Sequence, residues 1–177
     1  MVIATSAARA TLITNGNFET GDFTGWTVAS SFTQVEPSGT GGITAESGIY
    51  YAELGNVGCC GTISQTIADL PGETLQLSYY HISDGGVPNY FEADWNGVTI
   101  AGSIISDASD QRPDGWLHFV FDVTGTGSDS LTFLDQNNPA DDGLDNVTLT
   151  ALATPEPGTV AILGAGVLGL VSRRRRK

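Results

Sequence analysis

The chain has 177 residues and a formal net charge of −13 at neutral pH. Five of its seven basic residues end the chain and Arg9 is the sixth, so Arg112 is the only cation between residues 11 and 153, against nineteen carboxylates. This negative charge excludes nucleic acid and anionic lipid as partners of that region, and it attracts divalent cations. Solubility outside the cell explains the same charge without any ligand.

The first ten residues are small and mostly apolar, and they end in Ala8-Arg9-Ala10. This triplet fits the A-x-A cleavage pattern of secretory signal peptides, which would start the mature chain at Thr11. A complete signal peptide has a basic start and about 7–15 apolar residues before the cleavage site, more than this segment holds. We interpret residues 1–10 as the remnant of a signal peptide that begins upstream.

Residues 11–153 have the length of one domain, are rich in Gly, Ser, Thr and β-branched residues, and lack a sustained 3.6-residue period. This composition predicts an all-β fold, a jelly-roll β-sandwich of about eight to ten short strands. The candidate strands are 11–14, 26–28, 43–54, 62–67, 74–82, 90–95, 98–103, 115–123, 130–134 and 144–152.

Two local patterns are sharp. Asn96-Gly97 lies between two candidate strands and favours a type I′ hairpin, because both central residues of that turn need positive φ. Within 115–123 the residues alternate cleanly, which predicts that one face of the strand is apolar. The residues of this face are Leu117, Phe119, Phe121 and Val123.

Both ends of this region resemble a known superfamily. The opening Leu12-Ile13-Thr14-Asn15-Gly16-Asn17-Phe18-Glu19, followed by Gly25-Trp26, is similar to the start of galactose-binding-like sandwiches, which include many carbohydrate-binding modules. The closing Leu144-Asp145-Asn146-Val147-Thr148-Leu149 resembles their last strand. The resemblance implies that Glu19 and Asp145 help to hold a structural calcium ion.

The residues around Asp145 support this pairing. In a regular strand Asp145 shares a face with Val147, Leu149 and Ala151, which is the expected inward face. An inward carboxylate is costly unless it is paired or bound to a metal, and calcium accepts such oxygen ligands. The alternative is a carboxylate at the rim that reaches water or a backbone amide.

The chain has two cysteines, Cys59 and Cys60, between Gly58 and Gly61. Three states remain open: a vicinal disulfide, an intermolecular disulfide, or buried reduced thiols. A metal site there is not expected, because the chain has no other cysteine and His81 and His118 fall on separate strands.

Catalytic motifs are missing from the sequence. It contains no zinc-protease, serine-hydrolase, phosphate-loop or dinucleotide motif, and nothing singles out a pair among its many carboxylates, so we expect no enzyme. Exposed aromatic rings stack on sugars, which makes Trp95 and Trp116 candidate carbohydrate contacts. Tryptophan in a sandwich is also explained by core packing.

The segment 154–177 differs from everything before it. Pro155-Glu156-Pro157 is followed by an uncharged apolar run over 159–172 and by the basic tail Arg173-Arg174-Arg175-Arg176-Lys177. As a helix the apolar run measures roughly 20 Å, so it spans a hydrocarbon core of roughly 30 Å only if the bilayer thins. The five cations favour the cytoplasmic side, which places the preceding domain outside.

These three features, in this order at the C-terminus, resemble a PEP-CTERM sorting signal. The resemblance implies recognition by an exosortase, a membrane-embedded transpeptidase-like cysteine protease of Gram-negative bacteria that cleaves near Pro155-Glu156-Pro157. It also implies export, anchoring in the membrane by the transmembrane helix during sorting, and delivery to the cell surface or extracellular matrix.

The sequence therefore predicts an exported, surface-sorted protein whose acidic sandwich binds extracellular polysaccharide. Two alternatives belong to other classes: a structural matrix protein without a specific ligand, and a glycan-active enzyme.

Overall fold

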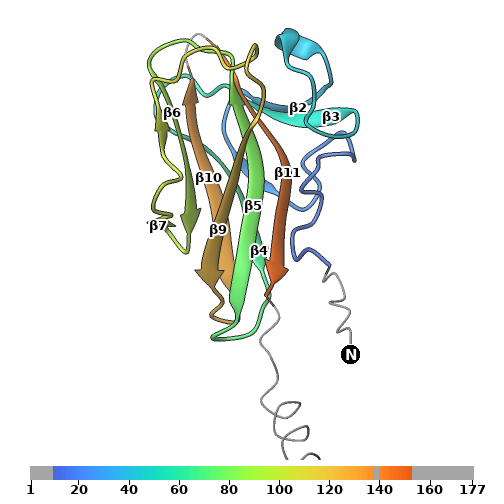
Figure 1. The fold of residues 1–177 in the computed structure, drawn as a ribbon, viewed down its shortest axis with the longest axis vertical. Coiled ribbons are helices and arrows are strands. Elements are labelled where there is room, and N and C mark those ends of the chain that lie inside the picture. The colour runs from blue at the N-terminus through green and yellow to red at the C-terminus, as the bar shows by residue number, and fades with distance from the viewer. Residues whose placement is uncertain (1–9, 138–139, 153–177) are drawn as a thin grey trace, which may run out of the picture.

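The computed structural model describes residues 10–137 and 140–152. Within these residues the fold is all-β, a sandwich of two antiparallel sheets that face each other (Figure 1), as the composition predicts. Apart from the strands, the described residues contain a three-residue 3₁₀ helix, η1 (Thr40–Gly42).

The strands form two layers, and the chain crosses between them several times. Sheet A has the order β1-β4-β10-β6-β7, with β8 also pairing with β6, and sheet B has the order β2-β3-β11-β5-β9. Sheet A consists of β1 (Thr27–Ala29), β4 (Gly61–Ile67), β6 (Asn89–Trp95), β7 (Val98–Thr99), β8 (Ile105–Ser106) and β10 (Asp129–Asn137). Sheet B consists of β2 (Thr33–Pro37), β3 (Tyr50–Leu54), β5 (Thr74–Ser83), β9 (Leu117–Thr124) and β11 (Asp142–Ala151).

Aromatic rings join the two sheets in the core. Tyr79 of β5 lies 5.9 Å from Phe91 of β6 and 5.1 Å from Phe133 of β10, measured between ring centroids, and Phe119 of β9 stacks on it at 5.1 Å. Tyr79, Phe91 and Phe133 are buried because alternate residues of their strands point inward. The opposite set of alternate residues forms the outer face of each sheet.

Both sharp local patterns are present. Asn96 and Gly97 have φ of 55° and 73° and connect β6 to β7 in the expected hairpin. In β9, Val123 pairs with Leu75 and Phe121 pairs with Leu77 of the buried face of β5, so the predicted apolar face is the inner face.

Some strand boundaries differ from the prediction. The described residues contain eleven strands, and β2 and β8 were not predicted. Residues 11–14 form no strand, and within 43–54 the strand covers only β3. The segment 43–49 instead crosses the outer face of sheet B, where Ile43 packs with Tyr51 and Ile82 in a small second core.

The expected orientation of Asp145 is wrong. The register of β11 shifts by a β-bulge between Asp145 and Thr148, with Asn146 at a φ of 54°. Asp145 therefore pairs with Tyr80 and faces outward, while Leu149 pairs with Leu77 and faces inward. Asp145 is nevertheless buried, because the segment before β3 covers it.

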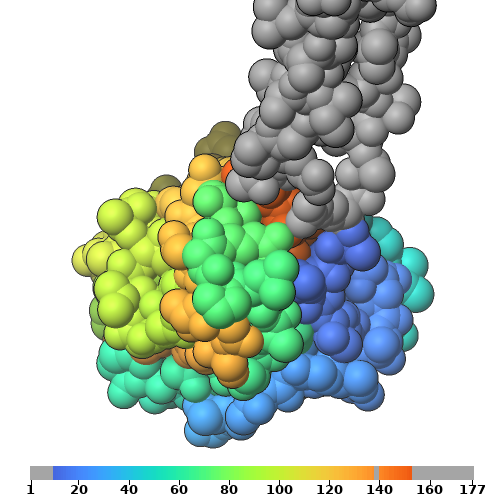
Figure 2. Space-filling model, turned by 90° about the horizontal axis from the view of Figure 1, so that it is seen from below, coloured from blue at the N-terminus to red at the C-terminus, as the bar shows by residue number. Residues whose placement is uncertain are grey.

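The two ends of the described domain lie side by side. The Leu12 N–H donates to the Leu149 carbonyl at 2.7 Å, and Figure 2 shows the first residues against the end of β11. β11 begins with Asp142 at the far end of the sandwich and ends with Ala151 here (Figure 1).

The predicted sorting signal at 154–177, the helix at 159–172 and most of the predicted signal-peptide remnant lie outside the described residues. Among the residues that are described, no helix is long and apolar enough to cross a membrane.

The aromatic layer should dominate the stability of the domain. We expect Phe91→Ala to lower the free energy of unfolding by about 3–5 kcal/mol, because it leaves a cavity between the sheets. The matched control Val98→Ala, at a side chain that is 70% exposed, should change it by less than about 0.5 kcal/mol. Urea unfolding followed by circular dichroism measures both, and equal losses would contradict the assignment of the core.

Candidate functional site

The outer face of sheet A carries polar and aromatic side chains in regular rows. Gln136 of β10 pairs with Tyr90 of β6, Leu134 pairs with Glu92, and Thr132 pairs with Asp94. On the other side of β10, Thr62 and Ser64 of β4 extend the second and third rows. We call these eight residues the sheet A face; all are half-buried.

Tyr90 is held in place on this face. Its hydroxyl donates to Glu92 Oε2 at 2.7 Å, and the Thr99 hydroxyl of β7 donates to the same oxygen at 3.2 Å. The hydrogen bond to Glu92, together with burial, raises the pKa of Tyr90 to about 12. The ring is thus fixed beside a carboxylate that keeps a second oxygen for other partners.

Asp94 offers an acceptor on the same face. Its Oδ1 is buried and has no hydrogen-bond partner among the described residues. Burial, and then the charge of Glu92, raise the pKa of Asp94 above its ordinary value. A ligand hydroxyl that donates to this oxygen would relieve the cost of its desolvation.

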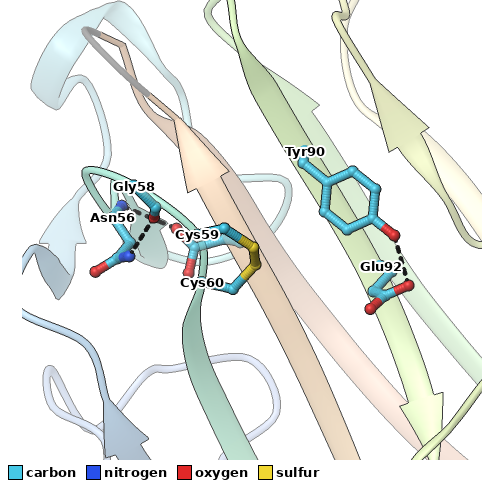
Figure 3. Close-up of a disulfide and its surroundings, with 7 residues drawn as sticks. Asn56, Gly58, Cys59, Cys60, Tyr90 and Glu92 are labelled. Carbon is cyan, nitrogen blue, oxygen red and sulfur yellow. Dashed lines mark hydrogen bonds between the residues drawn. A yellow bond between two sulfur atoms is a disulfide. The ribbon is translucent and has the colours of Figure 1, made fainter.

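The cysteine pair borders the sheet A face. Cys59 and Cys60 are joined in a vicinal disulfide, with a cis peptide bond between them, so among the three states the structure has the bridge within the pair. Cys60 directly precedes Gly61, which pairs with Asp135 next to Gln136. Figure 3 shows the disulfide in front of β10 and the Tyr90 ring in front of the neighbouring β6. Cys59 is exposed, so an apolar sulfur edge is available at this border.

The chemistry of the face is that of a binding surface. An aromatic ring, a leucine and a disulfide supply apolar contacts, while carboxylate, amide and hydroxyl groups supply hydrogen bonds. The two histidines lie elsewhere: His81 is buried in β5, and His118 stacks on Tyr80 at 4.3 Å on the outer face of sheet B. The alternation within 90–95 was the available sequence signal for Tyr90 and Glu92, but the pairing with Gln136 was not visible there.

The predicted calcium ligands converge on one segment. Glu19 Oε1 accepts the N–H groups of Ile49 and Tyr50 at 2.9 and 3.0 Å. Asp145 Oδ2 accepts the Ser47 N–H at 3.1 Å, and its Oδ1 accepts the Asn146 N–H at 2.6 Å. The structure thus brings two residues that are far apart in sequence to the segment 46–50.

These residues fit a hard cation in the type of their donors, which are all oxygens. Asp145 is fully buried, and burial raises its pKa to about 7, a cost that a bound cation would remove. Each carboxylate also has backbone amide partners, as the alternative interpretation expected. Among the described residues, no three His, Cys, Asp or Glu side chains are grouped so that they could hold a metal.

The two tryptophans predicted to contact carbohydrate lie on different sheets. Trp95 pairs with Leu131 toward the core, and its indole N–H donates to the Thr124 carbonyl at 3.0 Å. Trp116 packs against Tyr51 over the outer face of sheet B and donates to the Thr44 carbonyl at 2.8 Å. The structure does not bring them together, and their role in sugar contact stays a prediction. The predicted sorting residues, Pro155, Glu156, Pro157, Arg173, Arg174, Arg175 and Arg176, lie outside the described residues.

Comparison with protein families matches residues 153–176 to the PEP-CTERM protein-sorting motif. A comparison with curated proteins found no match.

Solved structures show the fold of the domain. The module TmCBM61, solved in complex with β-1,4-galactotriose, is 18% identical, with a TM-score of 0.58, and the match covers 80% of this chain and 99% of that one. The CBM22-1 xylan-binding domain of Paenibacillus barcinonensis Xyn10C is also 18% identical, with a TM-score of 0.56 over 84% and 100% of the two chains. The C-terminal family 22 module of Clostridium thermocellum Xyn10B is 16% identical, with a TM-score of 0.56 over 79% and 94%. The chain therefore carries a β-sandwich with the fold of carbohydrate-binding modules, followed in sequence by a PEP-CTERM sorting motif.

Burial of Asp135 should make the stability depend on pH. Burial raises its pKa to about 6, although its Oδ2 accepts the Asn56 N–H. Because the folded state binds this proton more tightly than the unfolded chain does, the stabilisation is complete below about pH 4 and is lost as the pH rises to about 6. We expect a loss on the order of 3 kcal/mol in the free energy of unfolding from this group, measured by urea unfolding with a chelator.

The substitution Asp135→Asn should flatten this part of the pH dependence, since the amide oxygen still accepts the Asn56 N–H but does not titrate. The exposed carboxylate Asp122 provides the control, and Asp122→Asn should leave the profile unchanged. An unaltered profile in Asp135→Asn would rule out this origin.

Proposed function

We propose that the protein is an exported, surface-sorted binding protein whose sheet A face binds a neutral extracellular polysaccharide on a sandwich of jelly-roll type. The observation that carries the proposal is the fixed Tyr90 ring beside the Glu92 and Asp94 carboxylates, with one Asp94 oxygen unpartnered within the described residues. A sugar ring placed on Tyr90 would bury its C–H groups and donate its hydroxyls to these acceptors.

The charge of the domain supports a neutral glycan. Between residues 11 and 153 there is one cation, and Arg112 already pairs with Asp110 at 2.8 Å. An anionic polysaccharide would meet repulsion on a face that itself presents Glu92 and Asp94. Neutral glycans are therefore the first to test: β-1,4-galactan, since TmCBM61 was solved with β-1,4-galactotriose, and xylan, since the CBM22-1 domain is named as xylan-binding.

We assign a supporting role to Trp95 and Trp116. Their indole N–H groups donate to backbone carbonyls and their rings pack on other side chains. Trp95 thereby joins the end of β6 to the end of β9, and Trp116 holds the segment 43–49 against sheet B.

The sorting motif supports delivery to the cell surface or extracellular matrix after processing by an exosortase. The polar rows of the sheet A face begin near Cys60, at one end of the sandwich. Ala151, from which the described chain leads toward the motif, lies at the opposite end. A purely structural matrix protein is the competing function, and it predicts no specific glycan. Binding without catalysis is supported by the carbohydrate-binding modules that share the fold.

We further propose that calcium stabilises the domain through Glu19 and Asp145. The convergence of both carboxylates on the segment 46–50 supports this, together with the complete burial of Asp145.

Affinity electrophoresis tests the binding face. We expect galactan or xylan in the gel to retard the full chain, and Tyr90→Ala to weaken binding at least about tenfold, roughly 1.4 kcal/mol. Tyr90→Phe keeps the ring but loses the hydrogen bond that fixes it, so it should weaken binding less than Tyr90→Ala does, and Glu92→Gln should bind several-fold more weakly.

The matched control is Tyr80→Ala, at a half-buried tyrosine on the outer face of sheet B. Equal losses in Tyr80→Ala and Tyr90→Ala would contradict the location of the site. Failure to bind any neutral glycan would favour the structural function instead.

Thermal unfolding tests the calcium proposal. We expect millimolar calcium to raise the unfolding midpoint of the full chain relative to chelator, since a ligand of the folded state alone stabilises it. Glu19→Gln and Asp145→Asn should each lose much of this rise, because each removes a negatively charged oxygen ligand from the proposed site. A calcium response unchanged in both variants would place the ion elsewhere.

A further inference from the structure

A cavity of about 450 Å³ opens at the end of the sandwich remote from Ala151. It lies where β3 and β10 end and β11 begins, apart from the sheet A face and from the segment 46–50. Its polar wall includes Glu53, Asn137 and Asp141, and its apolar wall includes Phe32 and Val57.

The two carboxylates of the wall are positioned differently. Glu53 is held by the Gln34 amide, which donates to Oε1 at 3.0 Å, and by the Tyr51 hydroxyl, which donates to Oε2 at 3.3 Å. Asp141 Oδ1 lies directly against Gly55, in space that any Cβ there would fill. Burial, and then the charge of Glu53, raise the pKa of Asp141 to about 6, so these like charges oppose each other.

Asn137 supplies a separate signal that the cavity takes a ligand. The residue is 1% exposed, and its Nδ2 donates to Asp142 Oδ1 at 3.0 Å, which fixes the orientation of the amide. Its Oδ1 is buried and has no hydrogen-bond partner among the described residues. A buried acceptor left unpaired destabilises the fold unless something binds it.

Within the described residues, no lysine or arginine forms an ion pair with the carboxylates of Glu53 and Asp141. The nearest guanidinium, that of Arg112, is bonded to Asp110 and lies 3.8 Å from Asp84, while Glu53 and Asp141 take part in no ion pair there. Asp135 and Asp142, both buried behind the wall, add further negative charge, and the basic side chain beside them is His81, whose Nε2 lies 3.7 Å from Asp142 Oδ2.

We propose that this cavity binds calcium through the carboxylates of Glu53 and Asp141 and the amide oxygen of Asn137, with water completing the coordination. Oxygen-only donors and an open side suit a hard cation that takes 6–8 ligands. Two carboxylates make a weak site, with a dissociation constant on the order of 10⁻⁴–10⁻³ M, as in other extracellular modules. The site is independent of the one proposed at Glu19 and Asp145.

Calorimetric titration of the full chain with calcium chloride tests this proposal. We expect Asp141→Asn and Glu53→Gln each to weaken binding at this site at least tenfold, while Asp122→Asn, at an exposed carboxylate of β9, leaves the isotherm unchanged. In a Glu19→Gln background, one calcium site should remain and should disappear when Asp141→Asn is added.

Circular dichroism is the control for folding of each variant. The substitutions Asp141→Asn and Glu53→Gln are isosteric, so they keep the shape of the cavity wall. Unchanged calcium binding in both Asp141→Asn and Glu53→Gln would overturn the proposal. The absence of binding to the wild-type chain at millimolar calcium would also overturn it.

Discussion

The contact between Tyr79 on one sheet and Phe91 and Phe133 on the other holds the sandwich together. Each ring is buried, and each comes from a strand in which every second residue points inward. Once these rings occupy the interface, the remaining residues of the same strands must form the outer faces. The position of Tyr90 and Glu92 on either side of Phe91 is therefore a direct consequence of core packing.

Departures from the regular strand are concentrated where the outer face of sheet B is covered. The bulge in β11 turns Asp145 outward, under the segment that precedes β3. Gly143 leaves space for the Trp116 ring, whose Cη2 lies 2.8 Å from where a Cβ would stand. The small core around Tyr51 and Ile82 depends on both features, because each lets a loop approach the sheet closely. Within the described part of the chain, the outer side chains of sheet A along β6 and β10 stay half-buried.

The carboxylates of the domain face a shared physical difficulty. Nineteen acids accompany one arginine between residues 11 and 153, so ion pairs cannot neutralise those that folding buries. At Glu19 and Asp145, hydrogen bonds from backbone amides stabilise the carboxylate. At Asp135 and Asp141, burial raises the pKa and so favours the uncharged, protonated form. The calcium ions that we propose at Glu19 and Asp145 and at Glu53 and Asp141 would neutralise buried carboxylates without protein cations.

The sequence alone determined the fold class, the Asn96-Gly97 hairpin, the apolar face of β9 and the sorting motif, because each depends on neighbours a few residues apart. Only the tertiary structure decided which outward residues meet: Gln136 lies beside Tyr90, and Glu53 and Asp141 line one cavity, because of the register between strands distant in sequence. The resemblance linked Glu19 with Asp145, but the side to which Asp145 points depended on a bulge at Asn146 that no alternating pattern predicts. Periodicity is a local property, whereas a site on a sandwich is assembled by pairing.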